Sequence, residues 1–509
     1  MDALTLLEQD KKKDLLRFVT AGSVDDGKST LIGKLLYESK GIYEDQLEAV
    51  IKVSGKVGST GGDVDLALVT DGLKAEREQG ITIDVAYRFF STPKRKFIIA
   101  DSPGHEQYTR NMATGASTAN LAIILIDAEQ GVLTQTRRHT FITSLLGIPH
   151  VVVAVNKMDL VDYSEAVYNK ICEDYTAFAA KLEVTDLTFI PMSALKGDNV
   201  VESSTNMPWY QGSTLLNHLE SVHIASDRNL IDLRFPVQYV SRPDRTFRGY
   251  MGTVASGVIR KGDEVMVIPS GIRTRISSVL GPDGEIEEAF PPLAVGVTVE
   301  DNVDISRGNT LVHVHNVPKI DRTLDAMVVW MNEDPLLPGK EYLIKHNTQS
   351  VAGVVSTLRY RVDVNTLHRS QRDQLALNEI GRCILTLSKP IAFDAYYRNR
   401  ATGSFIIVDR VSNNTVGAGM ILDRKSDKAV ADLDKAAGRP RSAHVQAHAS
   451  LVSRADRVTR MGGTPQTLWL TGLTASGKTT LAYGLEKQLF DLGRNAYVID
   501  GGNARLGFS

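Results

Sequence analysis

The chain has 509 residues, 42% of them hydrophobic and 23% charged, which is enough apolar material for roughly three to four folded domains. A formal net charge of −2 gives no overall basic field of the kind that attracts nucleic acid. Only Cys172 and Cys383 are cysteines, so we expect neither a disulfide framework nor a zinc cluster. The N-terminus lacks a signal-peptide pattern and no run is long enough for a membrane helix, so we expect a cytoplasmic protein with no membrane contact.

In residues 1–230, short apolar strands alternate with helical patterns, which predicts a mostly parallel α/β sheet with crossover helices. The strand runs are LLRFVTAG, KFIIADSPG, LAIILIDAEQG, HVVVAVNKMD and LTFIPMSA. Ligands bind at the carboxyl ends of the strands in such sheets. The polar tails SVDDGKS, DSPGH, NKMD and SAL all stand at those ends, so we expect one ligand site there.

The first tail is a phosphate-binding loop of the form GxxxxGK[ST], between a strand and a helical pattern. Its glycines let the backbone wrap around phosphates, its lysine reaches the β- and γ-phosphates, and its hydroxyl binds Mg²⁺. The loop residues predicted to bind the nucleotide are Gly22, Ser23, Val24, Asp25, Asp26, Gly27, Lys28, Ser29 and Thr30.

Two further segments supply groups for the γ-phosphate and the metal. Asp101 ends a buried strand, where its carboxylate can support the Mg²⁺ shell, and Gly104 can offer its N–H to the γ-phosphate. Thr82 lies in a polar stretch that can close over the metal, so we expect Ser29 and Thr82 as Mg²⁺ ligands. His105 is the best candidate for the catalytic residue, because phosphoryl transfer to water needs a positioned nucleophile.

The tails NKMD and SAL predict that the base is guanine. The Asp159 carboxylate can accept from the N1–H and the 2-amino group of guanine, whereas adenine would leave it unpaired. The Ala194 N–H can meet guanine O6. The residues predicted for guanine are Asn156, Lys157, Asp159, Ser193 and Ala194, so residues 1–230 form a GTP-binding domain with GTP as substrate.

The pattern changes at about Asp232, where short strands follow one another with turn sequences such as SRPD, RKGD and GPDG between them. This spacing predicts antiparallel β-barrels, which we place at residues 231–322 and 323–424. Residues 425–460 lose both aromatic residues and strand periodicity and predict a linker.

A second phosphate-binding loop, GLTASGKT, stands in residues 461–509. It follows the apolar run TLWL and opens a helical pattern with leucines at positions 481, 485 and 489. This order of strand, loop and helix is typical of an ATP-using P-loop kinase, in which Gly472, Gly477, Lys478 and Thr479 would contact phosphate.

With these motifs together, the chain resembles translational GTPases of the elongation factor Tu kind, in which a P-loop GTPase domain precedes two antiparallel β-barrels. It is most similar to the large GTPase subunit of bacterial sulfate adenylyltransferase, through GSVDDGKSTLIGKLLYESK, DGLKAEREQGITIDVAYRFF, DSPGHEQYTRNMATGAS and NKMDL. The resemblance implies a GTPase that works with a separate catalytic subunit, on which ATP and sulfate give adenosine 5′-phosphosulfate and pyrophosphate. It also implies that Val24 and Ile81 flank the catalytic histidine as an apolar gate.

The last segment resembles adenylylsulfate kinase through TGLTASGKTTLA and DGGNARLG, as in the bifunctional type of this subunit. The kinase family has an aspartate where Gly502 stands, and that carboxylate is tied to the metal and the substrate hydroxyl. We therefore expect residues 461–509 to be a truncated kinase-like segment without kinase activity.

The alternative function is that of a translation factor that binds aminoacyl-tRNA, since such a factor shares the GTPase domain and the barrels. The net charge of −2 and the segments GSVDDGKS and YRFF favour the sulfate adenylyltransferase subunit.

Overall fold

The computed structural model divides the chain into two compact units, Met1–Ser426 and Asp427–Ser509. It describes residues 13–39, 82, 84–105, 108–182, 184, 186–224, 228–244, 247–364, 366–422, 468, 470, 477–491 and 498. Within these residues, no helix is long and apolar enough to cross a membrane.

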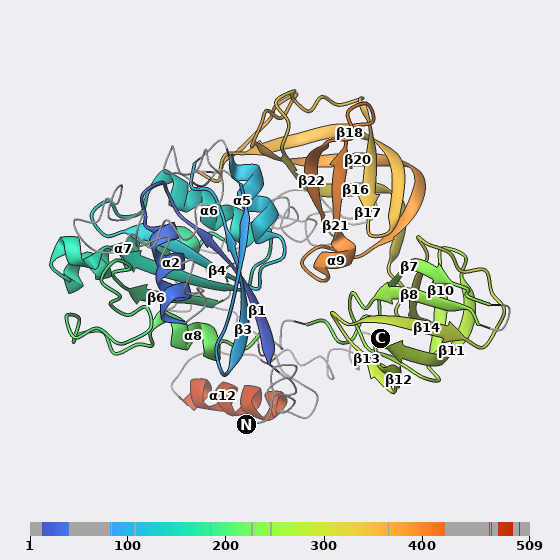
Figure 1. Cartoon of the computed structure of the whole chain (residues 1–509), viewed down its shortest axis with the longest axis horizontal. Helices are drawn as coiled ribbons and strands as arrows, with labels where there is room; N and C mark the ends of the chain where they lie inside the picture. Colours follow the sequence, from blue (N-terminus) through green and yellow to red (C-terminus); the bar gives the residue numbers. More distant parts are fainter. Residues whose placement is uncertain are drawn as a thin grey trace. The chain divides into compact units, whose positions relative to one another are not determined.

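The first domain is built on a six-stranded sheet with the order β2-β3-β1-β4-β5-β6 (Figure 1). All neighbouring strands are parallel except β2, an edge strand that runs antiparallel to β3. The strands are β1 (Asp14–Ala21), β2 (Ala86–Ser91), β3 (Arg95–Asp101), β4 (Leu121–Asp127), β5 (His150–Asn156) and β6 (Asp186–Pro191). The predicted parallel sheet is therefore confirmed, with β1 at its centre.

Helices cover both faces of this sheet. They are α2 (Lys28–Glu38), α5 (Thr109–Ala116), α6 (Thr134–Leu145), η3 (Met158–Val161), α7 (Glu165–Ala179) and α8 (Leu215–Ser221). Side-chain oxygens cap two of them, because Ser164 accepts from Val167 N at the start of α7 and Thr214 accepts from Asn217 N at the start of α8.

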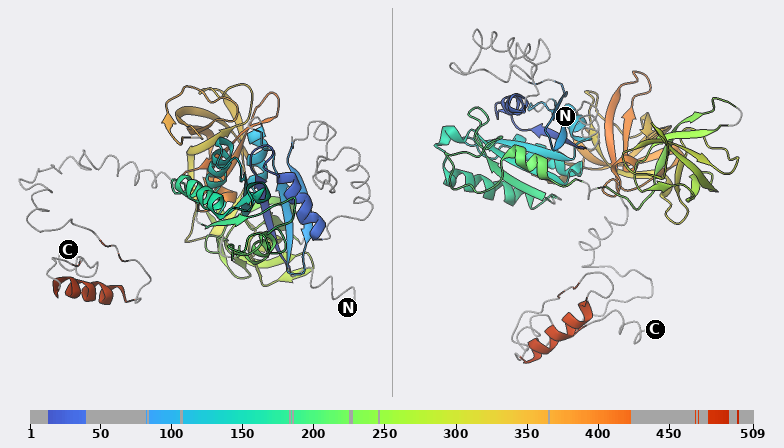
Figure 2. Two further views of the ribbon diagram at one scale, coloured as in Figure 1. Left: turned by 90° about the vertical axis from the view of Figure 1, so that its left-hand side faces the viewer. Right: turned by 60° about the horizontal axis from the view of Figure 1, so that its bottom comes forward.

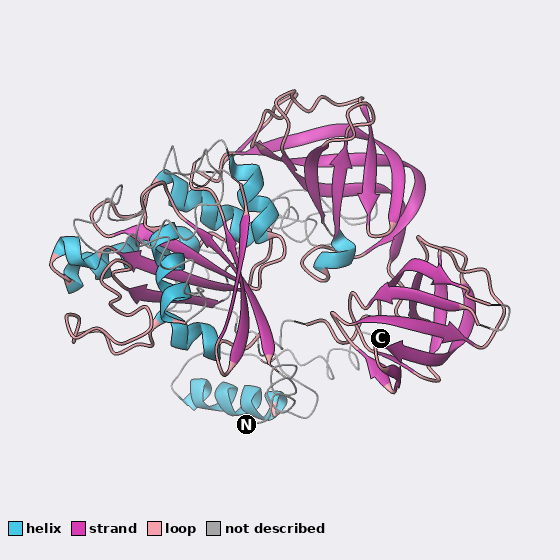
Figure 3. Ribbon diagram, viewed as in Figure 1, coloured by secondary structure: helices cyan, strands magenta, loops and turns pink. Residues whose placement is uncertain are grey.

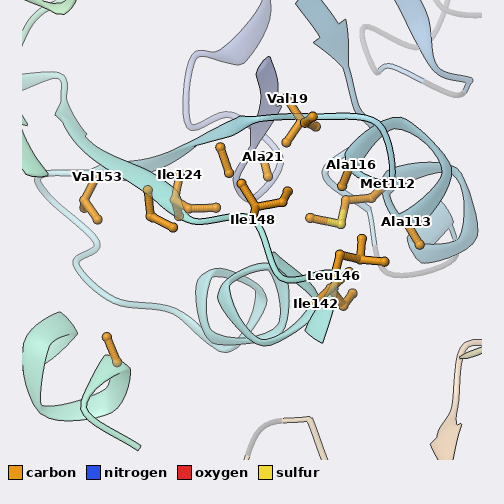
Figure 4. Close-up of a cluster of buried hydrophobic side chains, with 14 of the residues drawn as sticks. Val19, Ala21, Met112, Ala113, Ala116, Ile124, Ile142, Leu146, Ile148 and Val153 are labelled. Carbon is orange, nitrogen blue, oxygen red and sulfur yellow. The ribbon is translucent and has the colours of Figure 1, made fainter. Parts of the chain in front are cut away.

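Burial on both faces explains why the sheet strands are continuous apolar runs. All of β4 is buried, and its alternate residues belong to two different hydrophobic clusters. One cluster includes residues of α5, α6 and α7, and the other includes residues of α2 and α8. Figure 4 shows part of the first, where Met112 and Ala116 of α5 lie near Val19 of β1, and where Ile148 lies between Ile124 of β4 and the α5 side chains.

Two antiparallel barrels follow, in which strands replace helices almost completely (Figure 3). The first closes in the order β10-β15-β7-β8-β14-β11 and back to β10. Its strands are β7 (Phe235–Ser241), β8 (Gly249–Thr253), β10 (Glu264–Ile268), β11 (Ile272–Gly281), β14 (Ala294–Val299) and β15 (Thr310–His313), with β12 (Gly284–Ile286) beside β11 and a separate pair β9 (Ile259–Arg260) and β13 (Glu288–Ala289).

The second barrel closes in the order β17-β21-β22-β16-β20-β18 and back to β17. Its elements are β16 (Lys319–Trp330), β17 (Glu341–His346), β18 (Gln349–Val362), β19 (Arg369–Ser370), β20 (Ile380–Phe393), α9 (Arg400–Gly403), β21 (Ser404–Val408) and β22 (Thr415–Ile421). Each barrel has its own buried core. The predicted architecture of two barrels is confirmed, although the boundary predicted between residues 322 and 323 falls inside β16.

Residues 394–403 join the three domains of this unit. Asp394 forms a buried bidentate ion pair with Arg234 from the first barrel segment, with distances of 2.7 and 2.9 Å. Arg398 forms a second bidentate pair, with Asp232, at 2.8 and 2.9 Å. Tyr396 Oη donates to the carbonyl of Leu146 in the first domain at 3.2 Å. This junction segment therefore bonds to both other domains.

The second unit contains α12 (Lys478–Asp491), the red helix of Figures 1 and 2. Gly477 precedes it with a φ of +82°, and Lys487 pairs with Asp491 at 3.0 Å within it. The side chain of Leu481, on the apolar face predicted from the leucine spacing, is 62% exposed.

Candidate functional site

The phosphate loop connects the end of the central strand β1 to the start of α2. Gly27 caps α2 with a φ of +88°, in the left-handed region that favours glycine. A Cβ on Gly27 would also lie 2.4 Å from Asn156 Nδ2, so a larger residue at this position would displace the Asn156 amide. The backbone of the loop and the strand end of β5 are therefore in direct contact.

Lys28 is buried beneath the loop, and its Nζ donates to the carbonyls of Gly22 at 3.1 Å and Ser23 at 2.6 Å. Burial lowers the pKa of Lys28, and the carboxylates of Asp26 and Asp101 oppose this effect. Gly104 packs against the same ammonium, since a Cβ there would lie 2.5 Å from Lys28 Nζ. The structure thus brings together the predicted lysine and the predicted γ-phosphate segment.

Oxygen donors of the kind that Mg²⁺ prefers surround this position. Ser29 stands in the first turn of α2, and Asp101 is buried at the end of β3, where its Oδ1 accepts from Thr20 Oγ1 at 3.3 Å. In the described residues, no group of three or more His, Cys, Asp or Glu side chains could hold a metal ion by itself. Hydroxyls, one carboxylate and phosphate oxygens suit Mg²⁺ without such a cluster.

Thr82 is described as half-buried outside any strand or helix, and its neighbour Ile81 lies outside the described residues. Two assignments, that of Thr82 to the metal and that of Ile81 to an apolar gate, therefore stay predictions. Val24 is exposed in the phosphate loop.

His105 is exposed and follows Gly104 directly, so it stands beside the segment that packs on Lys28. Its ring lies 6.0 Å from the ring of Tyr108 in an edge-on arrangement. This place is compatible with the predicted role of orienting water, which stays a prediction.

The buried side chain of Asn156 ties three predicted segments together. Its Nδ2 donates to the carbonyl of Asp26 in the phosphate loop at 2.8 Å. Its Oδ1 accepts from Ala194 N in the SAL segment, also at 2.8 Å. Asn156 itself is only 2% exposed at the end of β5. In the structure the Ala194 N–H therefore bonds to Asn156, and its assignment to guanine O6 stays a prediction.

The other guanine candidates lie around this bridge. Lys157 adopts a left-handed conformation and its Nζ pairs with Asp127 Oδ2 at 2.9 Å. Asp159 is half-buried in the first turn of η3. Ser193 Oγ accepts from Lys196 N at 3.2 Å, so its hydroxyl shapes the turn of the SAL segment.

Two residues near the site, Asp127 and His139, were missed in the sequence. Asp127 ends β4 and holds Lys157, and the rule that polar strand ends line the ligand site could have identified it. His139 is buried in α6, where burial, Lys28 and Arg138 lower its pKa to about 3. Its Nδ1 has no hydrogen-bond partner in the described structure. No sequence signal shows that a histidine in a helical pattern will be buried close to the phosphate-loop lysine.

The side chain of Asp26 also differs from expectation. From the sequence we expect Asp26 to bind the nucleotide like the other loop residues. In the structure it is 2% exposed and its Oδ2 accepts from Ser23 N. Burial raises its pKa to about 6, against the opposing charge of Lys28.

In the second phosphate loop, Gly477, Lys478 and Thr479 stand at the start of α12, and Gly472 lies outside the described residues. Gly502, on which the expected lack of kinase activity depends, lies outside them too.

Three family models match the chain. Residues 13–231 match the elongation factor Tu GTP binding domain, residues 323–422 match the GTP-eEF1A C-terminal domain-like family, and residues 464–509 match adenylylsulphate kinase. Among solved structures, sup35 complexed with GDP matches with a TM-score of 0.38 and 22% identity, over 81% of this chain and 94% of that one.

Curated relatives are much more similar. The bifunctional enzyme CysN/CysC of Rhodopirellula baltica is 58% identical over 99% of this chain and 78% of its own. The enzyme of the same name from Mycobacterium tuberculosis is 54% identical over 97% of this chain and 79% of its own. Sulfate adenylyltransferase subunit 1 of Bacteroides fragilis is 57% identical over 85% of this chain and 91% of its own. The chain therefore belongs to the family of sulfate adenylyltransferase subunit 1 and the bifunctional CysN/CysC enzymes.

Proposed function

We propose that this chain is the GTP-hydrolysing subunit of a sulfate adenylyltransferase. GTP hydrolysis on its first domain drives the formation of adenosine 5′-phosphosulfate and pyrophosphate from ATP and sulfate on a separate catalytic subunit. The observation that carries the proposal is the Asn156 bridge, which joins the phosphate loop to the guanine segments in a chain of this family. The names of the relatives favour this function over that of a translation factor.

Each group has a defined task in this proposal. The loop amides and Lys28 hold the phosphates, while Asp159 accepts from guanine and rejects adenine, which would leave a carboxylate unpaired. Ser29 and Thr82 would hold Mg²⁺, with Asp101 supporting its shell. When bound, Mg²⁺ neutralises charge on the β- and γ-phosphates. His105 orients the water that attacks the γ-phosphate.

The partner supplies the sites for ATP and sulfate, which fits the name "subunit 1" of several relatives. Residues 464–509 match the kinase family, but Gly502 replaces the carboxylate that the kinase chemistry needs. We therefore propose no kinase activity for this segment. Formation of 3′-phosphoadenosine 5′-phosphosulfate by the chain alone would refute that part.

The test is an assay of ATP- and sulfate-dependent pyrophosphate release. The chain is mixed with the candidate catalytic subunit, with and without GTP, and a Lys28→Ala chain serves as the control. We expect GTP to increase pyrophosphate release only with the unmodified chain. Equal release with both chains, or stimulation of GTP hydrolysis by ribosomes, would contradict the proposed function.

A further inference from the structure

The phosphate loop contains a carboxylate where its chemistry calls for positive charge. Loop amides and a lysine form an anion site, because N–H groups and an ammonium attract phosphate. Asp26 nevertheless lies inside this loop and is 2% exposed, while the adjacent Asp25 is exposed. Burying a carboxylate costs free energy unless it is paired, so a buried carboxylate in this loop needs a functional explanation.

The Asp26 carboxylate contacts the residues that hold the lysine. Its Oδ2 accepts from Ser23 N, and a Cβ on Gly22 would lie 2.8 Å from the same oxygen. The carbonyls of Gly22 and Ser23 in turn accept from Lys28 Nζ. The carboxylate and the ammonium therefore contact the backbone of the same two residues, Gly22 and Ser23.

Charges from three elements act on Asp26. Lys28 of α2 is the largest opposing charge, Asp127 of β4 raises the pKa of Asp26, and Lys157 after β5 lowers it. Lys157 is already paired with Asp127 at 2.9 Å, which leaves Lys28 as the main cation available to the Asp26 carboxylate. Asp26 likewise comes before Asp101 and Asp25 among the carboxylates that act on Lys28.

We propose that Asp26 competes with the nucleotide phosphates for Lys28 and for the Ser23 N–H, and so weakens nucleotide binding and speeds GDP release. This inference rests on the proposed function and explains how GDP leaves the site so that GTP can bind again. Each turnover leaves GDP on the loop, and a built-in negative charge favours its departure. The device needs no second protein, because the competing anion belongs to the loop itself.

The test removes the charge and keeps the hydrogen-bond acceptor. In Asp26→Asn, the amide oxygen can still accept from Ser23 N. The measurement is the dissociation rate of N-methylanthraniloyl-GDP from the full chain, with the equilibrium affinity for the same probe, at low and high salt. We expect release to slow on the order of tenfold or more, and the difference to persist at high salt because buried charges are poorly screened.

Asp25→Asn is the matched control, since it removes the same charge from the neighbouring exposed position. Its effect should be smaller and should vanish at high salt. Equal or faster release from Asp26→Asn would overturn the role of Asp26, as would equal effects of both substitutions at high salt. If neither the unmodified chain nor the variant binds the probe, the proposed GTP site itself is wrong. If both bind it with equal release rates, only the role of Asp26 is wrong.

Discussion

Replacing Asn156 by alanine should uncouple the phosphate loop from the SAL segment, which we propose to bind guanine. The substitution leaves two buried groups unpaired, the carbonyl of Asp26 and the N–H of Ala194. A buried group without a partner costs about 1–3 kcal/mol, so the free energy of unfolding should fall by about 2–6 kcal/mol. GTP affinity should fall at least about tenfold, because binding must then order two loops that Asn156 now holds together.

Asn199 provides a matched control for this prediction. It is also buried, its Nδ2 donates to the carbonyl of Pro191 at 2.9 Å, and its Oδ1 accepts from Ser204 N at 2.8 Å. Asn199→Ala should therefore cost similar stability without loosening the phosphate loop. Urea denaturation measures the stability of both variants, and calorimetric titration measures their GTP affinity. If both variants bind GTP equally well, the bridge has no role in positioning the site.

Three further predictions follow from the structure. His105→Ala should lower GTP turnover by about 10²–10⁴-fold and leave GTP affinity nearly intact, and unchanged turnover would contradict its role. Asp394→Ala leaves the buried guanidinium of Arg234 uncompensated and should reduce the free energy of unfolding by about 3–5 kcal/mol, as measured by urea denaturation; a negligible loss would show that the pair is not needed. His139 has a pKa of about 3 in the folded chain against an ordinary pKa of 6.5, so its contribution to stability is complete above pH 6.5 and is lost as the pH falls from 6.5 towards 3. The slope is about 1.4 kcal/mol per pH unit in that window, and His139→Gln should flatten it between pH 7 and pH 5; an identical slope would refute the assignment.

The parallel sheet could be predicted because burial on both faces leaves an unmistakable apolar pattern. LAIILID forms β4, and every one of its residues is buried. The edge strand β2 was not predicted as a strand, because its aromatic residues lie on both faces, with Tyr87 and Phe89 exposed and Phe90 buried, and so give no apolar alternation. Barrel closure is also invisible to local patterns, since β7 pairs with β15, far along the chain.

The motifs of the site could be predicted, but not the direction of each side chain. Asp25 and Asp26 are identical in type and adjacent, yet one is exposed and the other buried. Asp25 has a φ of +67°, and this left-handed turn separates the environments of the two carboxylates. The two hydrogen bonds from the Asn156 side chain to two different loops likewise depend on packing around the end of β5, which the spacing of the motifs does not reveal.

The junction at residues 394–403 has a consequence for how chains of this family can be rearranged in evolution. Because Asp394, Tyr396 and Arg398 bond to the first domain and to the first barrel segment, exchange of one domain would remove bonds that hold the others. A further domain that follows residue 422 leaves these bonds intact. The relatives agree with this: those named subunit 1 match over 83–85% of the chain and the bifunctional ones over 97–99%, so the variable part of the family's organisation falls outside the three joined domains.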